Sequence, residues 1–162
     1  MGEFSKALNL LYELLDEVGS SDLNQRSKIY GNLANTYGVL GRREKQREYL
    51  LGSLCSSKRS PDQNHATIIS NYFNLANFYT KEENFTKAYF WLGIFKANAT
   101  KYYLESDYFY LYAMLRVKLH IKEKDFTSAR AILDKVLRDF DQHSAGSEYL
   151  SFLAQKHPSQ AL

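Results

Sequence analysis

The tetrapeptide Asn-Leu-Ala-Asn occurs twice in this chain, at residues 32–35 and again 42 residues later at 74–77. Each copy lies inside the longer frame Tyr-x2-Leu-Ala-x2-Tyr, which runs from Tyr30 to Tyr37 and from Tyr72 to Tyr79. The apolar residues of this frame recur at i, i+3, i+4 and i+7, the spacing of one face of an α-helix. An internal repeat at such a period is typical of stacked supersecondary units. The sequence therefore predicts a repeat architecture.

A second helical pattern follows the first. Nine residues after Tyr79 stands Ala88, and Leu92 and Phe95 continue the same helical face. Small side chains are expected where two helices approach closely, because larger ones would clash there. We therefore expect antiparallel helix pairs, with no strands and a period of about 40 residues. The positions equivalent to Ala88 lie 39, 42 and 41 residues apart along the chain: Ala7, Gln46, Ala88 and Ala129.

These patterns divide the chain into expected elements. Residues 1–143 should form a half repeat plus three helix pairs, and residues 144–162 a closing helix near 145–157 with a frayed tail. In the last pair, strict spacing places Arg116 at a core position, whereas a shift of one residue places Leu115 there. Because the array starts with a second helix, and solenoid ends need a cap, we expect a piece of a longer protein. The expected helices are 3–18, 25–39, 43–57, 65–81, 85–102, 106–122 and 126–140.

The two patterns together resemble the tetratricopeptide repeat, whose signature is Trp-x2-Leu-Gly-x2-Tyr on the first helix and Ala-x3-Phe on the second. This chain has Tyr for Trp, Ala for Gly and Leu for Phe. Its period exceeds the about 34 residues of that family, and Thr100 stands where the closing proline is expected. Armadillo and HEAT repeats, at about 40–47 residues, are the rival helical arrays. The resemblance implies an all-α fold, a right-handed α-solenoid of antiparallel helix pairs.

Composition and charge exclude several classes of protein. A net charge of +3 over 162 residues is too small for a dedicated binder of nucleic-acid backbone. No apolar run is long enough to cross a membrane, and no secretory signal precedes the first pattern. The single cysteine, Cys55, rules out an intrachain disulfide framework and favours a reducing, cytoplasmic location. We expect Cys55 to be a small buried residue on the inner side of its helix.

Signals of catalysis are weak throughout. The four histidines are never spaced at i+3 or i+4, and no phosphate-cradling glycine loop or Gly-x-Ser-x-Gly elbow occurs. Charges near His120 are explained as surface charge at a helix end. The basic cluster at residues 42–47 is interrupted by Glu44, which favours a solvated, ion-paired face. The aromatic segment 102–112 favours inter-helix packing over a docking platform. The sequence thus predicts no enzyme, no cofactor, no metal site and no direct nucleic-acid binding.

The repeated asparagines indicate a function more clearly than the histidines, the basic cluster or the aromatic segment do. An Asn side chain both donates and accepts hydrogen bonds, as the backbone of an extended peptide requires. The resemblance implies that the first helix of each pair lines a concave groove and that its asparagines clamp ligand backbone. The alternative is that they cap or bridge helices. In this hypothesis Lys28 meets an acidic group and Phe73 supplies apolar contact. The predicted groove residues are Lys28, Asn32, Asn35, Phe73, Asn74 and Asn77.

The sequence therefore indicates a non-catalytic scaffold that binds a protein or peptide. Arrays with a long period and tyrosine-rich first helices are similar to the sensory domains of bacterial regulators. This similarity implies a regulatory or interaction domain of a larger bacterial protein that acts in signalling or transcription. The alternative is a homodimerisation platform of such a regulator, in which the ends of the array pair with a second copy.

Overall fold

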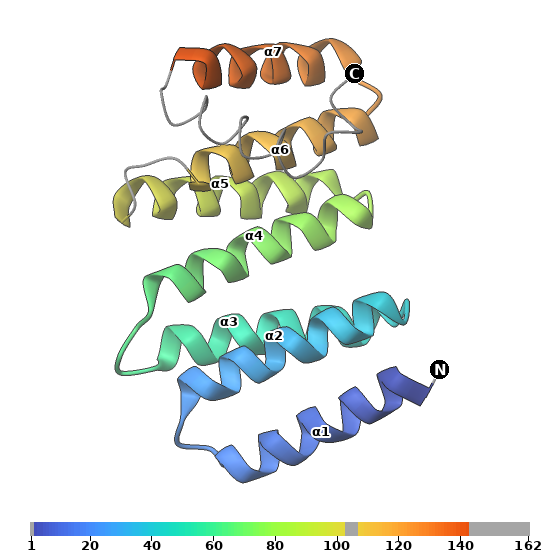
Figure 1. Cartoon of the computed structure of the whole chain (residues 1–162), viewed down its shortest axis with the longest axis vertical. Coiled ribbons are helices and arrows are strands. Elements are labelled where there is room, and N and C mark those ends of the chain that lie inside the picture. The colour runs from blue at the N-terminus through green and yellow to red at the C-terminus, as the bar shows by residue number, and fades with distance from the viewer. Residues whose placement is uncertain (1, 103–106, 143–162) are drawn as a thin grey trace, which may run out of the picture. The chain divides into compact units, whose positions relative to one another are not determined.

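The computed structural model describes residues 2–102 and 107–142, which contain seven α-helices and no strand (Figure 1). The prediction of an all-helical chain is confirmed for these residues, and the seven expected ranges agree with the structure to within about two residues, the usual uncertainty of helix ends. The expected closing helix lies outside the described residues. The helices are α1 Gly2–Val18, α2 Leu23–Val39, α3 Arg43–Arg59, α4 His65–Lys81, α5 Phe85–Tyr102, α6 Asp107–Lys122 and α7 Phe126–Gln142.

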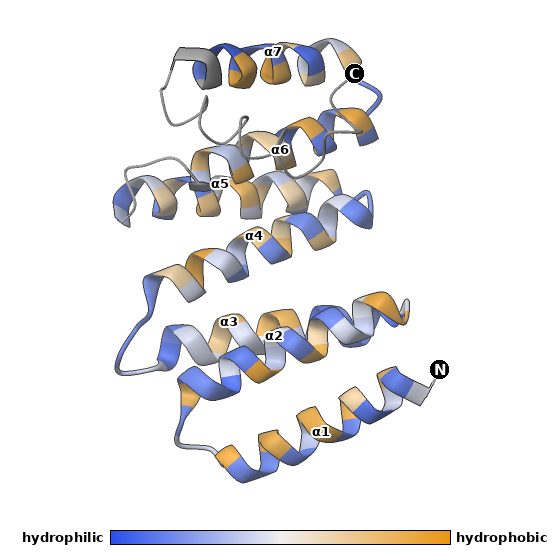
Figure 2. Cartoon of the chain, in the orientation of Figure 1, coloured by the Kyte–Doolittle hydropathy of each residue, from blue (hydrophilic) through white to orange (hydrophobic). Residues whose placement is uncertain are grey.

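The chain divides into two compact units, Met1–Leu104 and Glu105–Leu162. The first contains α1 to α5. Within it, α2 packs closely on α3 and α4 on α5, and smaller contacts join α1 to α2 and α3 to α4 (Figure 1). The second unit contains α6 and α7, which pack on each other. Each helix of both units carries both apolar and polar residues along its length (Figure 2).

The repeat is visible in the turns that join paired helices. Each turn contains one residue with positive φ, namely Gly41 (70°), Glu83 (55°) and Lys124 (63°). Glycine adopts this conformation without strain, whereas Glu83 and Lys124 do so at a steric penalty. In each turn the next N–H donates to a carbonyl five residues back, a common way to end a helix. These bonds are Arg42 N to Tyr37 O, Asn84 N to Tyr79 O and Asp125 N to His120 O, at 2.9, 3.0 and 2.8 Å.

Most helices begin with a side-chain cap. Asp22, Asn64, Asn84 and Asp125 each accept a hydrogen bond from the backbone N–H three residues later, at 2.9–3.2 Å. Such caps satisfy one of the N–H groups that have no partner within the helix. At the start of α3 the cap position is held by Arg42, whose side chain makes no capping bond. Its backbone angles (φ −83°, ψ 75°) nevertheless resemble those of Asp22 (φ −87°, ψ 82°).

We therefore expect Arg42→Asp to stabilise the first unit. The backbone already has the geometry of a capped residue, so the new carboxylate can accept from the first turn of α3 without rearrangement. The gain should be about 0.5–2 kcal/mol, the usual range for a cap. Urea unfolding followed by circular dichroism measures it. Arg42→Ala, which removes the same charge and adds no cap, is the matched control and should lie much closer to the parent.

The core of the first unit follows the repeated frame. Leu33 and Ala34 on α2, like Leu75 and Ala76 on α4, are fully buried. On α5 the second pattern is also confirmed, because its three inward positions are buried. The small alanines allow the helices to approach closely, as the sequence predicts. The buried residues of the second pattern are Ala88, Leu92 and Phe95.

The two pairs of the first unit fill equivalent positions differently. In the α2–α3 pair the alanine position is taken by Gln46, which is buried and faces Gly38. A Cβ atom placed on Gly38 would lie 2.5 Å from Gln46 Nε2, so any larger residue at position 38 would require the end of the Gln46 side chain to shift. The equivalent positions of the α4–α5 pair, 42 residues later, hold Thr80 and Ala88, both fully buried. The α2–α3 pair thus has glycine and glutamine where the α4–α5 pair has threonine and alanine.

A buried polar network replaces apolar packing in the α2–α3 pair. Ser53 Oγ donates to Ser27 O at 2.8 Å, or to Asn71 Oδ1 at 2.9 Å, and Asn71 Nδ2 donates to Ser57 Oγ at 3.1 Å. All four side chains are buried. Buried polar groups are tolerated only when they are hydrogen-bonded. These bonds therefore link α2, α3 and α4 at a place where misalignment would leave polar groups unpaired.

In the second unit, α6 buries Leu115, whereas Arg116 is half-buried with its guanidinium 5.9 Å from the ring centre of Tyr112. The alternative that places Leu115 in the core is therefore correct. Long basic side chains can cover apolar surface while the charge stays in solvent, which explains why Arg116 is tolerated beside the core. On α7, Ala129 is buried as predicted. Leu133, four residues after Ala129 at the position equivalent to the buried Leu92, is exposed.

The prediction that Cys55 is buried is also wrong, because the structure places it on the exposed side of α3. The inward stripe of α3 runs through Gln46, Leu50, Ser53 and Ser57. At about 100° per residue, position 55 lies roughly 200° around the helix from Ser53. Its helical phase, and not its apolar character, decides its exposure.

Candidate functional site

The predicted groove residues divide between two helices. Asn32 and Asn35 are exposed on α2, whereas Asn74 and Asn77 are half-buried on α4. Both helices pack on α3. The asparagines of α2 therefore present their amides to solvent, while those of α4 are partly covered. Equivalent sequence positions do not have equivalent exposure here.

The other two predicted groove residues differ in the same way. Lys28 is exposed on α2. Phe73 is half-buried on α4, and its ring centre lies 5.6 Å from that of Phe95, a fully buried residue of α5. Part of the Phe73 ring therefore belongs to the packing between α4 and α5, and only its remaining surface is free for a ligand.

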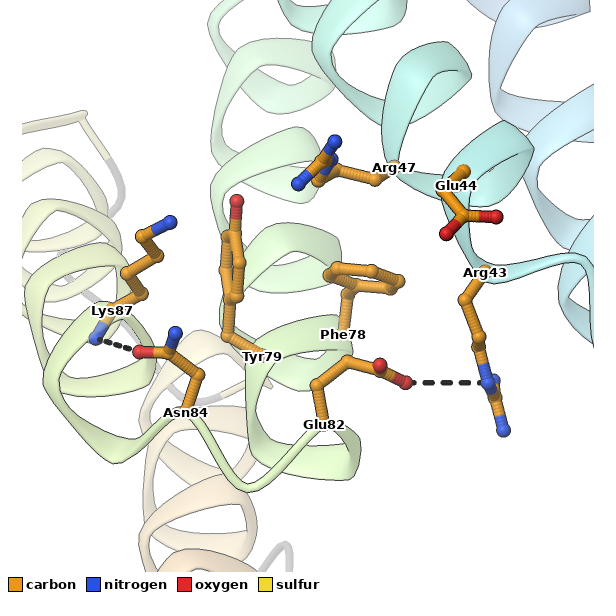
Figure 3. A pocket seen from close by; sticks show the side chains of 8 residues that line it. All are labelled: Arg43, Glu44, Arg47, Phe78, Tyr79, Glu82, Asn84 and Lys87. Carbon is orange, nitrogen blue, oxygen red and sulfur yellow. Dashed lines mark hydrogen bonds and ion pairs between the residues drawn. The ribbon is translucent and has the colours of Figure 1, made fainter.

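A separate open pocket lies where the start of α3 meets the end of α4 and the start of α5 (Figure 3). Its volume is about 290 Å³. Aromatic side chains form part of the wall, and charged side chains surround them (Figure 3). The lining residues are Arg43, Glu44, Arg47, Phe78, Tyr79, Glu82, Asn84 and Lys87.

The charges of this pocket are partly paired. Arg43 Nε lies 3.2 Å from Glu82 Oε1, which joins α3 to the residue that follows α4 (Figure 3). The Lys87 ammonium lies 5.3 Å from the ring centre of Tyr79, within the range of a cation–π contact. Among the residues that the structure describes, no carboxylate lies within 4.0 Å of a nitrogen of Arg47 or Lys87. Two cations therefore face the pocket with no ionic partner among the described residues.

The sequence singles out only the basic residues that α3 contributes to this pocket. Arg43 and Arg47 belong to the basic cluster interpreted as a solvated face, and both are indeed exposed. The aromatic wall and Lys87 come from the next repeat, and their approach depends on how α4 packs on α3. One feature of the sequence could have pointed to this half of the pocket. Tyr79 ends the repeated frame, and Lys87 lies eight residues later, beyond the turn.

A cluster of tyrosines joins α1 to the next two helices. Tyr12 OH lies 2.8 Å from both Tyr37 OH and Tyr49 OH, and the rings of Tyr37 and Tyr49 are stacked at 5.5 Å. Burial raises the pKa of Tyr12 and Tyr49, and the hydrogen bond with Tyr12 raises the pKa of Tyr37. Tyrosines with an ordinary pKa near 10 are already protonated at neutral pH, and the upward shift keeps these phenols protonated in more alkaline solution as well. The cluster therefore acts as a hydrogen-bonded structural contact.

Two histidines make local contacts. The His65 ring is stacked on that of Tyr102 at 3.8 Å, so this end of the aromatic segment is used in packing between α4 and α5. His120 Nδ1 lies 3.3 Å from Asp125 and 3.8 Å from Glu123, at the end of α6. Hydrogen bonds from Ser128 chiefly lower the pKa of Asp125, as expected for a helix cap. The interpretation of helix-end charge is thus supported, although the His120 side chain is only 13% exposed.

No grouping of three or more His, Cys, Asp or Glu side chains suited to a metal ion occurs in the part of the chain that the structure describes. Over the same residues, no helix has the length and apolar character needed to cross a membrane. The sequence matches no protein-family model, and comparisons with curated proteins and with solved structures give no significant match.

Proposed function

We propose that this chain is a non-catalytic scaffold that binds a protein or peptide, built as a tetratricopeptide-like α-solenoid of antiparallel helix pairs. One observation carries the proposal: in the first unit each helix packs on its neighbours in the chain, from α1 through α5. In a solenoid each repeat contacts only the repeats beside it. The recurrence of the same turn at Gly41, Glu83 and Lys124 supports this reading.

Such packing favours binding over catalysis. A helix that packs chiefly on its neighbours keeps a long face open, and solenoids use such faces as extended binding surfaces. On α2 this open face carries Lys28, Asn32 and Asn35, all exposed. Amide groups that donate and accept hydrogen bonds are suited to the backbone of an extended segment. We therefore place the partner's backbone along α2 and the uncovered part of α4.

The resemblance to sensory repeat domains also supports a proposal for the biological role of the chain. In this view the chain is the regulatory or interaction part of a larger bacterial regulator of signalling or transcription. It would act in the cytoplasm on a protein or peptide partner, without a cofactor and without touching nucleic acid directly.

The test is a binding measurement on paired variants. A peptide is selected against the wild-type chain from a display library, labelled, and titrated with wild type and with Asn35→Ala, Asn77→Ala. Each lost hydrogen bond should weaken binding by about 0.5–1.5 kcal/mol. Fluorescence anisotropy gives the dissociation constants, and circular dichroism confirms that the variant keeps the parental helix content.

The matched control is Asn9→Ala, Gln25→Ala, which also removes two exposed amides, from α1 and from the start of α2. This control should bind the peptide like wild type. Equal affinity of both double variants would show that the asparagines of the repeat do not contact the partner. Failure of every library to yield a binding peptide would refute the proposed function itself.

Homodimerisation is the second candidate, and one observation favours it. Leu10 and Leu14 of α1 are 56% and 37% exposed and lie one turn apart. Apolar side chains on the surface of a helix can form the contact between two copies. Light scattering over a wide concentration range separates the candidates, because a chain that stays monomeric is not a dimerisation platform.

A further inference from the structure

We propose that the pocket between α3, α4 and α5 is an anion site that takes the carboxylate of an acidic side chain on the bound peptide. The inference rests on the proposed function, because it names the chemistry of the partner. The pocket is formed by the start of α3 and by residues around the α4–α5 turn, and none of the predicted groove residues lines it (Figure 3).

The charge balance of the pocket carries the proposal. Three cations and two carboxylates line it, and one of each is already joined in the Arg43–Glu82 ion pair. The remaining charges are Arg47 and Lys87 against Glu44 alone. Because Arg47 and Lys87 have no carboxylate partner among the described residues, a negative group entering the pocket meets an excess of positive charge.

The arrangement of the two cations suits a carboxylate. Tyr79 stands between them, with Lys87 of α5 on one side and Arg47 of α3 on the other (Figure 3). A guanidinium can bind both oxygens of a carboxylate, and an ammonium adds a point charge. The first turn of α3 lies at the same place, and the side chain of Arg42 does not cap it. The uncapped N–H groups add positive potential to the pocket.

The size of the pocket decides between a side chain and a free small molecule. At about 290 Å³ it lies at the lower limit of pockets that enclose a small ligand, which span about 300–1,000 Å³. Such pockets are also mostly apolar, whereas this one is lined largely by charged groups and is open to solvent. A single acidic side chain, anchored by its own peptide, fits these dimensions.

The test uses defined peptides and amide resonances. The probe is acetyl-Gly-Gly-Glu-Gly-Gly-amide, and its Gln analogue is the neutral control. Two further probes, the phosphoserine analogue and inorganic phosphate, report the source of the anion. We expect the Glu peptide, but not the Gln peptide, to shift the amide resonances of Arg47 and Lys87. Raising the salt concentration should reduce these shifts, since both cations are exposed.

Charge variants complete the test. Arg47→Gln, Lys87→Gln should weaken binding of the Glu peptide by at least about tenfold, because charge-assisted hydrogen bonds are lost. Lys45→Gln, Lys58→Gln removes the same charge from exposed positions outside the pocket, and should change the dissociation constant by less than about twofold.

The outcomes separate this inference from the proposed function. Equal shifts with the Glu and Gln peptides, or equal losses in the two double variants, would overturn the anion site. Shifts with phosphate or phosphoserine alone would overturn the carboxylate assignment. If library peptides still bind through Asn35 and Asn77 while the Glu peptide leaves the pocket unperturbed, the scaffold stands and the anion site does not.

Discussion

Leu75→Ala is expected to lower the free energy of unfolding by roughly 2–5 kcal/mol, the range for a buried leucine replaced by alanine. Leu75 is fully buried on α4, a helix that packs on both α3 and α5. Truncation of the Leu75 side chain leaves a cavity, because the packed helices around it can move only partly into the space. Urea unfolding followed by circular dichroism at 222 nm, a wavelength that reports helix content, measures the loss.

Leu51→Ala is the matched control, because the same atoms are removed from a side chain that is 41% exposed on α3. Substitutions at exposed positions usually change stability by no more than about 0.5 kcal/mol. A Leu75 variant that unfolds together with the Leu51 variant would show that the inward face of α4 has been assigned incorrectly.

Helix positions could be predicted from the sequence because they depend on local signals. The spacing from Tyr72 to Tyr79 defines one helical face, and the polar residues after Lys81 end the helix. Capping residues such as Asn64 and Asp125 mark helix starts in the same local way. These signals need no knowledge of neighbouring helices, which explains why the predicted ranges agree with the structure.

Exposure and sites could not be predicted as well, because they depend on what each helix packs against. Cys55 and Leu133 have apolar character but lie on outward faces. The asparagines of α2 and α4 share a sequence pattern and differ in exposure. The pocket brings Arg47 together with Lys87, which are 40 residues apart in the sequence. Only the packing of α4 on α3 brings such residues together.

Gly38→Thr is expected to destabilise the first unit by about 1–3 kcal/mol, the usual penalty for overfilling a packed interior. A Cβ atom on residue 38 would lie 2.5 Å from Gln46 Nε2 and 2.9 Å from its Cδ. Gln46 is itself buried, and a shift of its amide away from residue 38 would disturb the hydrogen bond that it accepts from Arg43 Nη1. Thermal or urea unfolding measures the effect. Ala88→Gln, which enlarges a fully buried residue at the position equivalent to Gln46, should produce a similar loss in the α4–α5 pair.

The double variant Gly38→Thr, Gln46→Ala tests whether the two positions are complementary in size. It gives the α2–α3 pair the threonine and alanine that the α4–α5 pair holds at Thr80 and Ala88. Residues in direct contact show coupling of about 0.5–3 kcal/mol in double-mutant cycles. We expect the double variant to be more stable than the sum of the single losses predicts. Additive losses would show that the glycine and the glutamine are independent, and that the size matching between equivalent positions is coincidental.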